Sequence, residues 1–243
     1  MVATERNADE GTSWHRAWPE GWTVHHVRET GSTNADLLNG AGGRSDRSVL
    51  VTDHQTAGRG RLDRRWDAPP GSNLLVSLLF QTVPSDPSEL VRRVSLAAVD
   101  AARTHTVGDL RLKWPNDVLL DGAKVAGVLA QRGPTGAVVV GIGINVGWSP
   151  DGAARLGDEV DRVELLAALL TAFDLLPADA DALRVRYRKE LATLGQRVRA
   201  EMPSGDVIGQ ATDVTVAGQL VVRGDDGRVH QIDVADVTHL RPA

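Results

Sequence analysis

The stretch DLRLKWPNDVLLDGAKVAGVLAQRGPTGAVVVGIGINV, residues 109–146, decides the fold. Its short apolar runs are separated by turn residues rather than by helical segments. Asp121-Gly122 is a strong hairpin signal, and Gly133–Gly136 forms a second turn between apolar runs. Pro115 ends the first run, because proline cannot donate a hydrogen bond to a strand ladder. The pattern predicts neighbouring strands joined by tight turns.

Gly141, Gly143 and Gly147 follow an apolar run with a spacing close to that of a dinucleotide-binding loop. Such a loop needs a helix that begins at the glycines, so that the helix N-terminus faces the pyrophosphate. Here the next helix is expected only near Asp161. We therefore reject a dinucleotide-binding fold. We interpret the segment as a glycine-rich strand that ends at Asn145 and offers its backbone as the floor under a flat ligand.

The segments before this stretch combine strands with helices. NLLVSLLF is continuously apolar, which is typical of a strand buried on both faces. The expected elements are strands at 22–27, 48–55 and 73–80, a helix at 32–41 capped by Ser32 or Thr33 and ended by Gly42 and Gly43, and a long helix at 88–104.

The segments after this stretch predict two helices and then a small β domain. Asp161 and Glu164 have the spacing of a capping box, and residues 180–200 form an amphipathic helical pattern. After Pro203 the sequence changes to short alternating strands separated by glycine-containing turns, which is typical of a five-stranded barrel of SH3-like size. The expected division is a disordered tail at 1–13, a large domain at 14–202 and an SH3-like domain at 203–243.

The composition is that of a globular protein. Of the 243 residues, 42% are hydrophobic and 24% are charged, enough for a substantial core. The absence of cysteine excludes disulfides and thiolate metal sites and is typical of a reducing compartment. Residues 1–11 lack the apolar core of a secretory signal, and no apolar run is long enough to span a membrane. We expect a cytoplasmic protein with no membrane partner.

Arginines gather in QTAGRGRLDRRW, residues 55–66, although the whole chain has a net charge of -5. Arginine offers a planar set of donors that suits carboxylate and phosphate oxygens, and glycine lets a loop move and approach a ligand closely. The segment therefore fits a loop that closes over anions. On composition alone it fits a solvated basic loop or a nucleic-acid contact equally well. The negative net charge disfavours duplex nucleic acid as the main partner.

Lysine is rare, with three lysines among 27 basic residues, and Lys113 and Lys124 lie close together in the sequence. In an extended strand, Lys113 takes the face opposite to Trp114. The turn that follows presents an amide and a carboxylate, Asn116 and Asp117. An ammonium group polarises phosphates, and carboxylate or amide oxygens suit Mg²⁺. The same residues also fit an ordinary edge strand that ends in an Asn-Asp turn.

Other catalytic chemistries have less support. The seven histidines lack metal-ligand spacing, and the absence of cysteine closes a thioester route. No serine lies in a nucleophile elbow.

Five ordered motifs resemble those of the biotin protein ligases (biotin–[acetyl-CoA-carboxylase] ligases). They are STN at 32–34, QTAGRGR at 55–61, KWPND at 113–117, KVAGVL at 124–129 and GIGINV at 141–146, and the resemblance covers roughly residues 22–243. It implies an α+β fold, in which a mixed β-sheet catalytic domain related to class II aminoacyl-tRNA synthetases and biotin–lipoate ligases precedes a small SH3-like β-barrel. It also implies that the chain converts biotin and MgATP to biotinyl-5′-AMP. The biotin would then pass to a specific lysine of the biotin carboxyl carrier protein of acyl-CoA carboxylases.

The resemblance implies roles for individual residues as well. The implied catalytic residues are Lys113, Arg59 and Arg61. The implied biotin contacts are Ser32, Thr33, Asn34, Gln55, Gly58, Arg59, Gly60, Arg61, Lys113 and Gly127. The implied ATP contacts are Arg61, Arg64, Trp66, Lys113, Asn116 and Asn145, with Asp117 as the Mg²⁺ ligand.

The chain departs from the family in two places. Many members carry GRGRRGRxW where this chain reads GRGRLDRRW, so Leu62 and Asp63 replace a basic residue and a glycine. We expect a less positive and stiffer loop, which bears on adenylate retention. Some members carry an N-terminal winged helix that represses transcription, whereas about twenty residues precede the first strand here. We expect a ligase without repressor activity or a nucleic-acid partner, and a monomer or weak homodimer.

Two alternatives stay open. A lipoate–protein ligase has a related fold and the same two-step chemistry, and the GRGR and KWPND motifs distinguish the two. A non-enzymatic RNA-binding or scaffold protein would use the basic loop and the terminal barrel. The net charge of -5 and the 4% aromatic content disfavour recognition of RNA by base stacking.

Overall fold

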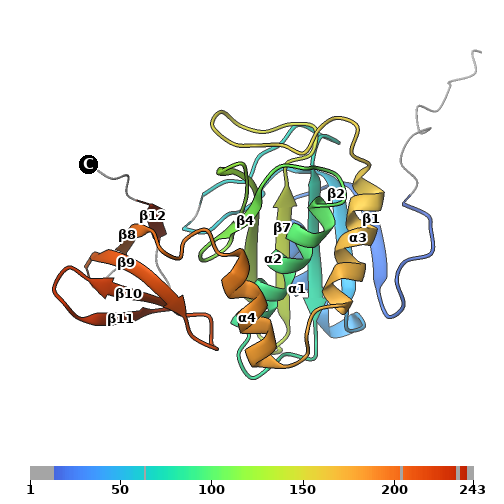
Figure 1. Ribbon diagram of the computed structural model, residues 1–243. Helices are drawn as coiled ribbons and strands as arrows, with labels where there is room; N and C mark the ends of the chain where they lie inside the picture. The colour runs from blue at the N-terminus through green and yellow to red at the C-terminus, as the bar shows by residue number, and fades with distance from the viewer. Residues whose placement is uncertain (1–13, 63, 203–204, 234–235, 240–243) are drawn as a thin grey trace, which may run out of the picture.

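The computed structural model describes residues 14–62, 64–202, 205–233 and 236–239 (Figure 1). The tail expected at 1–13 lies outside the described residues. The larger sheet has seven strands in the order β1-β2-β3-β7-β6-β5-β4. β1 and β2 pair in parallel and the other neighbours pair antiparallel, so the sheet is mixed, as predicted. The strands are β1 (Thr23–Thr30), β2 (Ser48–Gln55), β3 (Leu74–Phe80), β4 (Leu110–Lys113), β5 (Asp117–Leu120), β6 (Ala123–Arg132) and β7 (Val138–Ile144).

The stretch 109–146 forms β4 to β7, and its turn residues act as predicted. Asp121 and Gly122 join β5 to β6 with φ angles of 50° and 81°, the left-handed pair that a two-residue hairpin turn favours. Gly133 donates its backbone N–H to the carbonyl oxygen of Ala137 (2.8 Å) and closes the turn between β6 and β7. Both predicted hairpins are confirmed.

Two helices cover one face of this sheet (Figure 1). α2 (Ser88–Ala102) and α3 (Arg162–Asp174) pack against each other, and α2 contacts β4, β5, β6 and β7. Alternate strand residues such as Val140 and Ile142 are buried in the main core on this side. α2 and α3 therefore do not cover the opposite face of the sheet.

A short helix covers one end of the opposite face. α1 (Thr33–Asn39) packs on β3 and β7, where Val139 belongs to a second, smaller core cluster. Because strand side chains alternate, Ser77, Gly141 and Gly143 lie on this same face, further along the strands. They form the floor of the cavity described below.

The second sheet is antiparallel, has the strand order β11-β10-β9-β8-β12 and lies beside β4 and α4 (Figure 1). Its strands are β8 (Arg197–Glu201), β9 (Val207–Val214), β10 (Leu220–Gly224), β11 (Val229–Ile232) and β12 (Asp236–His239). The small β domain expected at the C-terminus is present. One of its five strands, β8, precedes residue 203.

The last helix is shorter than predicted. α4 runs from Ala180 to Glu190, and the predicted continuation to Ala200 is wrong. Leu191 forms a bridge with Leu112 of β4, and Ala192 donates its backbone N–H to the Leu112 carbonyl oxygen (2.8 Å). This pairing with β4 takes the chain out of the helix and leads it into β8.

The C-terminal end of α1 and the capping of its N-terminus differ from the prediction, and the N-terminal cap of α3 agrees with it. α1 ends at Asn39, before the predicted Gly42 and Gly43, which lie in a short 3-10 turn. Ser32 occupies the N-cap position of α1, but its side chain makes no capping hydrogen bond. Asp161 caps α3 as predicted, because its carboxylate accepts hydrogen bonds from two backbone N–H groups.

Candidate active site

A cavity of about 370 Å³ opens on the sheet face that α2 and α3 leave free. Val237 of β12 also lines it, so both sheets contribute. The predicted site residues that line it are Ser32, Thr33, Asn34, Gln55, Arg59, Gly60, Arg61, Arg64, Trp66, Lys113, Asn116, Asp117, Gly127 and Asn145. Gly58 is outside this lining but accepts a hydrogen bond from the backbone N–H of Trp66 (3.1 Å). The structure therefore brings the predicted residues together.

Strand glycines let large side chains lie on the cavity floor. Gly127 and Gly143 face each other on β6 and β7, and a methyl group on Gly143 would lie within 3.0 Å of the Trp66 indole ring. A methyl group on Gly141 would meet the side-chain amide of Asn34 equally closely. The ring and the amide thus lie against bare backbone, in agreement with the interpretation of this strand as a floor.

Trp66 carries a buried polar atom that the protein leaves unused. Its indole nitrogen Nε1 has no hydrogen-bond partner among the described residues. A buried donor without an acceptor costs about 1–3 kcal/mol. The ammonium group of Lys124 lies 5.5 Å from the centre of the same ring, within cation–π range. The indole is therefore a place where an acceptor on a ligand would be favourable.

On the side of β2 and β3, the cavity is lined by uncharged, hydrogen-bonded side chains. Gln55 Oε1 accepts hydrogen bonds from the backbone N–H (2.9 Å) and the hydroxyl (3.1 Å) of Thr33. Ser77 Oγ lies 2.7 Å from Thr33 Oγ1 and donates to Asn34 Oδ1 (2.6 Å). Asn34 Nδ2 donates to Gln131 Oε1 (2.9 Å). This network holds its members in place and suits a neutral polar ligand group.

On the side of β4 to β6, the cavity is positively charged. Lys113 on β4 and Lys124 on β6 both line it. Lys124 Nζ lies 2.6 Å from the Asp117 carboxylate, and Arg61 Nη1 donates to Asn116 Oδ1 (3.2 Å). Lys113, Lys124 and Arg61 thus share this side of the cavity with one carboxylate, Asp117, and the excess positive charge attracts anions.

His239 of β12 stands close to this charged side. Its Nε2 lies 3.2 Å from Thr193 Oγ1. Burial, and secondly the charge of Lys113, lower the pKa of the His239 imidazole below its ordinary value. The neutral imidazole is therefore favoured, and it adds no further positive charge beside the lysine.

The described residues of the arginine-rich segment, 58–62 and 64–66, lie at the cavity, and all of them except Gly58 line it. A methyl group on Gly58 would lie within 3.0 Å of the Trp66 carbonyl oxygen, so the two arms of the loop approach closely. Leu62 lies at the tip, exposed, with a φ of 55°. Asp63 lies outside the described residues, and the stiffening expected from the Leu62-Asp63 pair stays a prediction.

Asn145 lines the cavity, but its side chain is already engaged. Its Oδ1 accepts a hydrogen bond from Asn73 Nδ2 (3.3 Å), and its Nδ2 donates to the Ala154 carbonyl oxygen (2.9 Å). Asn73 Oδ1 in turn accepts a hydrogen bond from the backbone N–H of Val146 (2.9 Å). Asn145 therefore fixes the loop after β7 with one of its two N–H donors and one acceptor site of its oxygen.

Asp117, the predicted Mg²⁺ ligand, is paired with Lys124. Over 14–62, 64–202, 205–233 and 236–239, no three His, Cys, Asp or Glu side chains gather in a way that could hold a metal ion. Mg²⁺ takes oxygen ligands, and nucleotide phosphates often supply some of them. The side chains of the cavity therefore do not form a cation site by themselves.

Sequence reasoning left several cavity residues out of the predicted site. The sequence drew attention to Lys124 through the scarcity of lysine and to Gly143 through the spacing of the glycines after an apolar run. Leu129 ends the KVAGVL motif but was given no role, and Ser77 lies within an apolar strand run and lines the cavity without any signal in the sequence.

Comparisons with known proteins agree with this geometry. Residues 28–149 match the model of the Biotin/lipoate A/B protein ligase family, and residues 193–240 match the Biotin protein ligase C terminal domain. The biotin–[acetyl-CoA-carboxylase] ligase of Mycobacterium tuberculosis is 37% identical, with 91% of each chain covered. The ligase of the same name from Paracoccus denitrificans is 33% identical over 83% of this chain and 95% of its own. The structure of a biotin protein ligase from Aquifex aeolicus in complex with biotin and ATP aligns with a TM-score of 0.77 at 25% identity, covering 89% of this chain and 99% of that chain.

The chain joins a mixed sheet that carries a polar and cationic cavity to a small β domain, and the two family models match these two parts. The chain belongs to the Biotin/lipoate A/B protein ligase family. Within that family, both relatives described above are named biotin–[acetyl-CoA-carboxylase] ligases. In the part of the chain that the structure describes, no helix has the length and apolar character that a membrane crossing needs.

Proposed function

We propose that this chain is an ATP-dependent biotin–protein ligase. It activates biotin to biotinyl-5′-AMP and transfers the biotin to a lysine of the biotin carboxyl carrier domain of acyl-CoA carboxylase. One observation carries the proposal: a single cavity joins a neutral hydrogen-bonding wall at β2 and β3 to a cationic wall at β4 to β6. A substrate with a neutral polar ring and a carboxylate fits these two walls, and the names of the two ligase relatives supply its identity.

The cationic wall addresses the main obstacle to adenylation, the approach of two anions. At about 4 Å and an effective dielectric constant near 20, two like charges repel by roughly 4 kcal/mol. Lys113, Lys124 and Arg61 make this encounter favourable. A carboxylate oxygen of biotin then attacks the α-phosphorus, pyrophosphate leaves, and no covalent enzyme intermediate is needed.

The second step transfers the activated acyl group. The neutral amine of the carrier lysine attacks the biotinyl carbonyl carbon, AMP leaves, and the amine releases a proton. The described residues of the segment 58–66 lie at the cavity, and closure of this loop would keep water away from the mixed anhydride until the carrier arrives. In this proposal Ser32, Thr33, Asn34 and Gln55 contact biotin.

The remaining site residues divide between the two substrates. Gly58, Arg59, Gly60, Arg61 and Gly127 contribute to the biotin side through the loop and the floor. Arg61, Arg64, Trp66, Asn116 and Asn145 lie on the nucleotide side. Asp117, the predicted Mg²⁺ ligand, pairs with Lys124, and the ATP phosphates would supply further oxygen ligands for the ion. The ion would neutralise phosphate charge there.

The proposal also covers the domain boundary, the cellular location, the oligomeric state and the partners of the enzyme. We place the division between the two domains ahead of β8, because Arg197–Glu201 pairs within the second sheet. We also propose a cytoplasmic enzyme, a monomer or weak homodimer, without repressor function or nucleic-acid partner. The net charge of -5 supports the absence of a nucleic-acid partner.

Lipoate is the competing substrate, because the matched family includes lipoate ligases. The C-terminal match, over residues 193–240, is to a domain of biotin protein ligases and favours biotin. Incubation with MgATP, a carrier domain whose acceptor lysine is unmodified, and either free biotin or free lipoate tests both. We expect the carrier mass to increase by one biotinyl group. Modification by lipoate alone, or by neither acid, would overturn the proposal.

Lys113→Ala tests the cationic wall directly. We expect this variant to lose biotin-dependent ATP–pyrophosphate exchange while it stays folded, because one cation that offsets the two anions is gone. Lys189→Ala is the matched control, since Lys189 lies on α4 outside the cavity. Full exchange by Lys113→Ala would refute the role of that lysine.

A further inference from the structure

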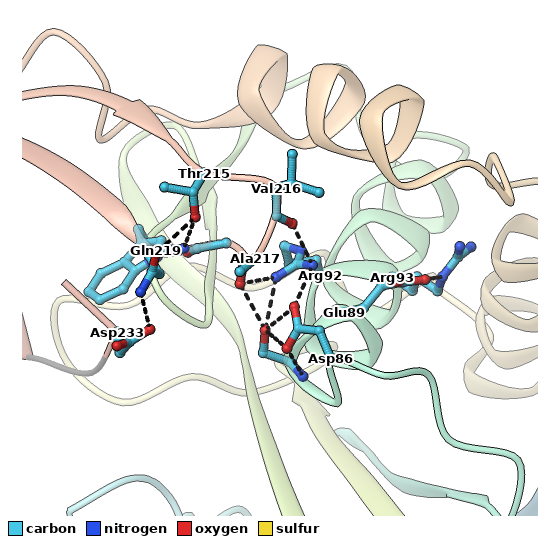
Figure 2. Close-up of polar contacts among 12 residues, drawn as sticks. Asp86, Glu89, Arg92, Arg93, Thr215, Val216, Ala217, Gln219 and Asp233 are labelled. Carbon is cyan, nitrogen blue, oxygen red and sulfur yellow. Dashed lines mark hydrogen bonds and ion pairs between the residues drawn. The ribbon is translucent and has the colours of Figure 1, made fainter. Parts of the chain in front are cut away.

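A turn of the second sheet is held by a buried arginine of the first domain (Figure 2). Arg92 of α2 is only 7% exposed. Its guanidinium donates hydrogen bonds to the backbone carbonyl oxygens of Val216 (3.1 Å) and Ala217 (2.7 Å), which lie in the turn between β9 and β10. On its own side it donates to Asp86 Oδ2 (3.0 Å) and to Ser88 Oγ (2.9 Å). Arg92 therefore links the two domains with nearly all of its donors in use.

Gly218 allows this contact. Its φ is 81°, and a methyl group at this position would lie within 3.0 Å of Arg92 Nη1. Any other residue would combine an unfavourable backbone conformation with a clash against the guanidinium. The turn is thus shaped to bring backbone carbonyls onto one buried cation.

The same turn also holds Trp114. The indole Nε1 of Trp114 donates to the Gly218 carbonyl oxygen (2.8 Å), and the backbone N–H of Trp114 donates to Thr193 Oγ1 (3.0 Å). Trp114 is only 3% exposed. The residue that follows Lys113 is therefore anchored at its side chain and its backbone by segments outside the seven-stranded sheet.

This anchor lies directly beside the cationic wall. Lys113, Trp114 and Asn116 all line the cavity, and Asn116 accepts the hydrogen bond from Arg61. A displacement of the Trp114 backbone would move Lys113 and Asn116 together, because they are consecutive or nearly consecutive in one short segment. Misplacement by about 1 Å can lower a rate about 100-fold.

We infer that Arg92 is a positioning residue for adenylation. It fixes the 216–218 turn, the turn fixes Trp114, and Trp114 sets the place of Lys113 and Asn116 in the cavity. This inference rests on the proposed ligase function, and it makes docking of the C-terminal domain a condition for an efficient first step. Arg92 itself touches no substrate.

Variants at both ends of this chain of contacts provide the test. Arg92→Met removes the guanidinium, and Trp114→Phe keeps a ring but removes one donor, and thermal unfolding shows at which temperatures each variant is fully folded. Arg93→Met is the matched control, because Arg93 pairs with Glu89 of its own helix and makes no contact with the turn (Figure 2). The full-length protein is assayed by biotin-dependent ATP–pyrophosphate exchange, by calorimetric titration with biotin and by thermal unfolding.

We expect Arg92→Met and Trp114→Phe each to lower kcat for exchange by about 10-fold or more, at temperatures where both are fully folded. The affinity for biotin should fall less than kcat does, because displacement of Lys113 weakens the contact with the biotin carboxylate and leaves the neutral wall at β2 and β3 in place. The double variant should be no slower than the slower single variant, since both act through one turn. Arg92→Lys should recover part of the rate, and Arg93→Met should match the parent.

Other outcomes separate the two hypotheses. Unchanged kcat in Arg92→Met, with only a lower melting temperature, would overturn the positioning role and leave the ligase function intact. Rate losses that multiply in the double variant would also overturn it, because the two residues would then act independently. Absence of exchange in the parent protein would instead overturn the proposed function.

Discussion

The cavity and the contact between the two domains use glycine in the same way and differ in what they leave unpaired. In the cavity, Gly143 lets the Trp66 indole lie against the strand backbone, and at the domain contact, Gly218 lets the Arg92 guanidinium reach the turn. Arg92 finds its acceptors within the protein. Trp66 Nε1 is buried without one among the described residues. At the domain contact the Arg92 donors are satisfied by protein acceptors, whereas in the cavity the Trp66 Nε1 donor is available to an acceptor on a ligand.

Adding one methyl group to the floor should have the largest effect. We expect Gly143→Ala to lower biotin-dependent exchange by at least about 100-fold, because the Trp66 ring must leave its place against the cavity floor. Gly42→Ala is the control, since a methyl group there meets nothing within 4 Å. Normal exchange by Gly143→Ala, measured at equal folded fraction, would show that the position of Trp66 is unimportant for the reaction.

The Lys124–Asp117 ion pair lies inside the cavity, so its loss should change the reaction rate directly rather than through the position of another residue. We expect Lys124→Ala to lower the exchange rate about 10- to 100-fold, because it removes a cation and exposes the Asp117 carboxylate to the substrate anions. The double variant Lys124→Ala with Asp117→Asn should recover part of this loss. A double variant as slow as, or slower than, Lys124→Ala in the same exchange assay would contradict the electrostatic explanation.

Most of the cavity residues were predicted through the resemblance of five motifs to those of the biotin protein ligases, and the strands and turns that carry these motifs follow local rules. Asp121-Gly122, the glycines of β7 and the clustered motifs fix strands and turns by short-range rules, and these rules held. The end of α4 was mispredicted because it depends on a distant partner, the pairing of Leu191 with Leu112 of β4. Arg197–Glu201 alternates between exposed and buried residues in the structure, whereas the sequence analysis assigned most of it to the helix.

The contact around Arg92 had no sequence signal at all. Arg92 sits in an ordinary amphipathic helix, and its acceptors are backbone carbonyl oxygens, whose position follows from the tertiary fold rather than from residue type. Asn145 illustrates the same limit, since its residue type fitted a ligand contact while its side chain holds the loop after β7. Residue type indicates what a group can bind, and only the fold determines which partner it finds.

A buried carboxylate with complete pairing should affect stability and leave catalysis unchanged. The Glu190 side chain is 5% exposed and accepts hydrogen bonds from Arg103 Nη2 (2.5 Å) and from Arg186. We expect Glu190→Gln to lower the free energy of unfolding by about 1–3 kcal/mol in denaturant titrations, because an amide donor then faces a guanidinium. The exposed Glu201→Gln serves as the control. A changed KM for ATP in Glu190→Gln would show that this region belongs to the cavity after all.

The same carboxylate has a predictable pH dependence. Burial alone would raise the pKa of Glu190, but the hydrogen bonds and charges of Arg103 and Arg186 outweigh it and hold the pKa below the ordinary value of 4.5. The stabilisation is therefore present above pH 4.5 and is lost as the pH falls through the lower pKa of the folded state. Denaturant titrations should show the parent and Glu190→Gln converging in stability as the pH falls below 4.5.

The smallest effect on stability is expected at His239, a residue of the second sheet that lies close to Lys113 of the cavity. Burial, and secondly the charge of Lys113, lower the pKa of His239 in the folded state, so the unfolded chain binds a proton more readily. Stability should therefore fall as the pH drops below the ordinary histidine value of 6.5, and His239→Gln should remove that part of the loss. Between pH 7.5 and pH 5.5, we expect the melting temperature of the parent to fall by up to about 3 °C more than that of the variant. Equal falls would mean that the imidazole is as readily protonated in the fold as in the unfolded chain, and that Lys113 exerts no measurable field on the C-terminal domain.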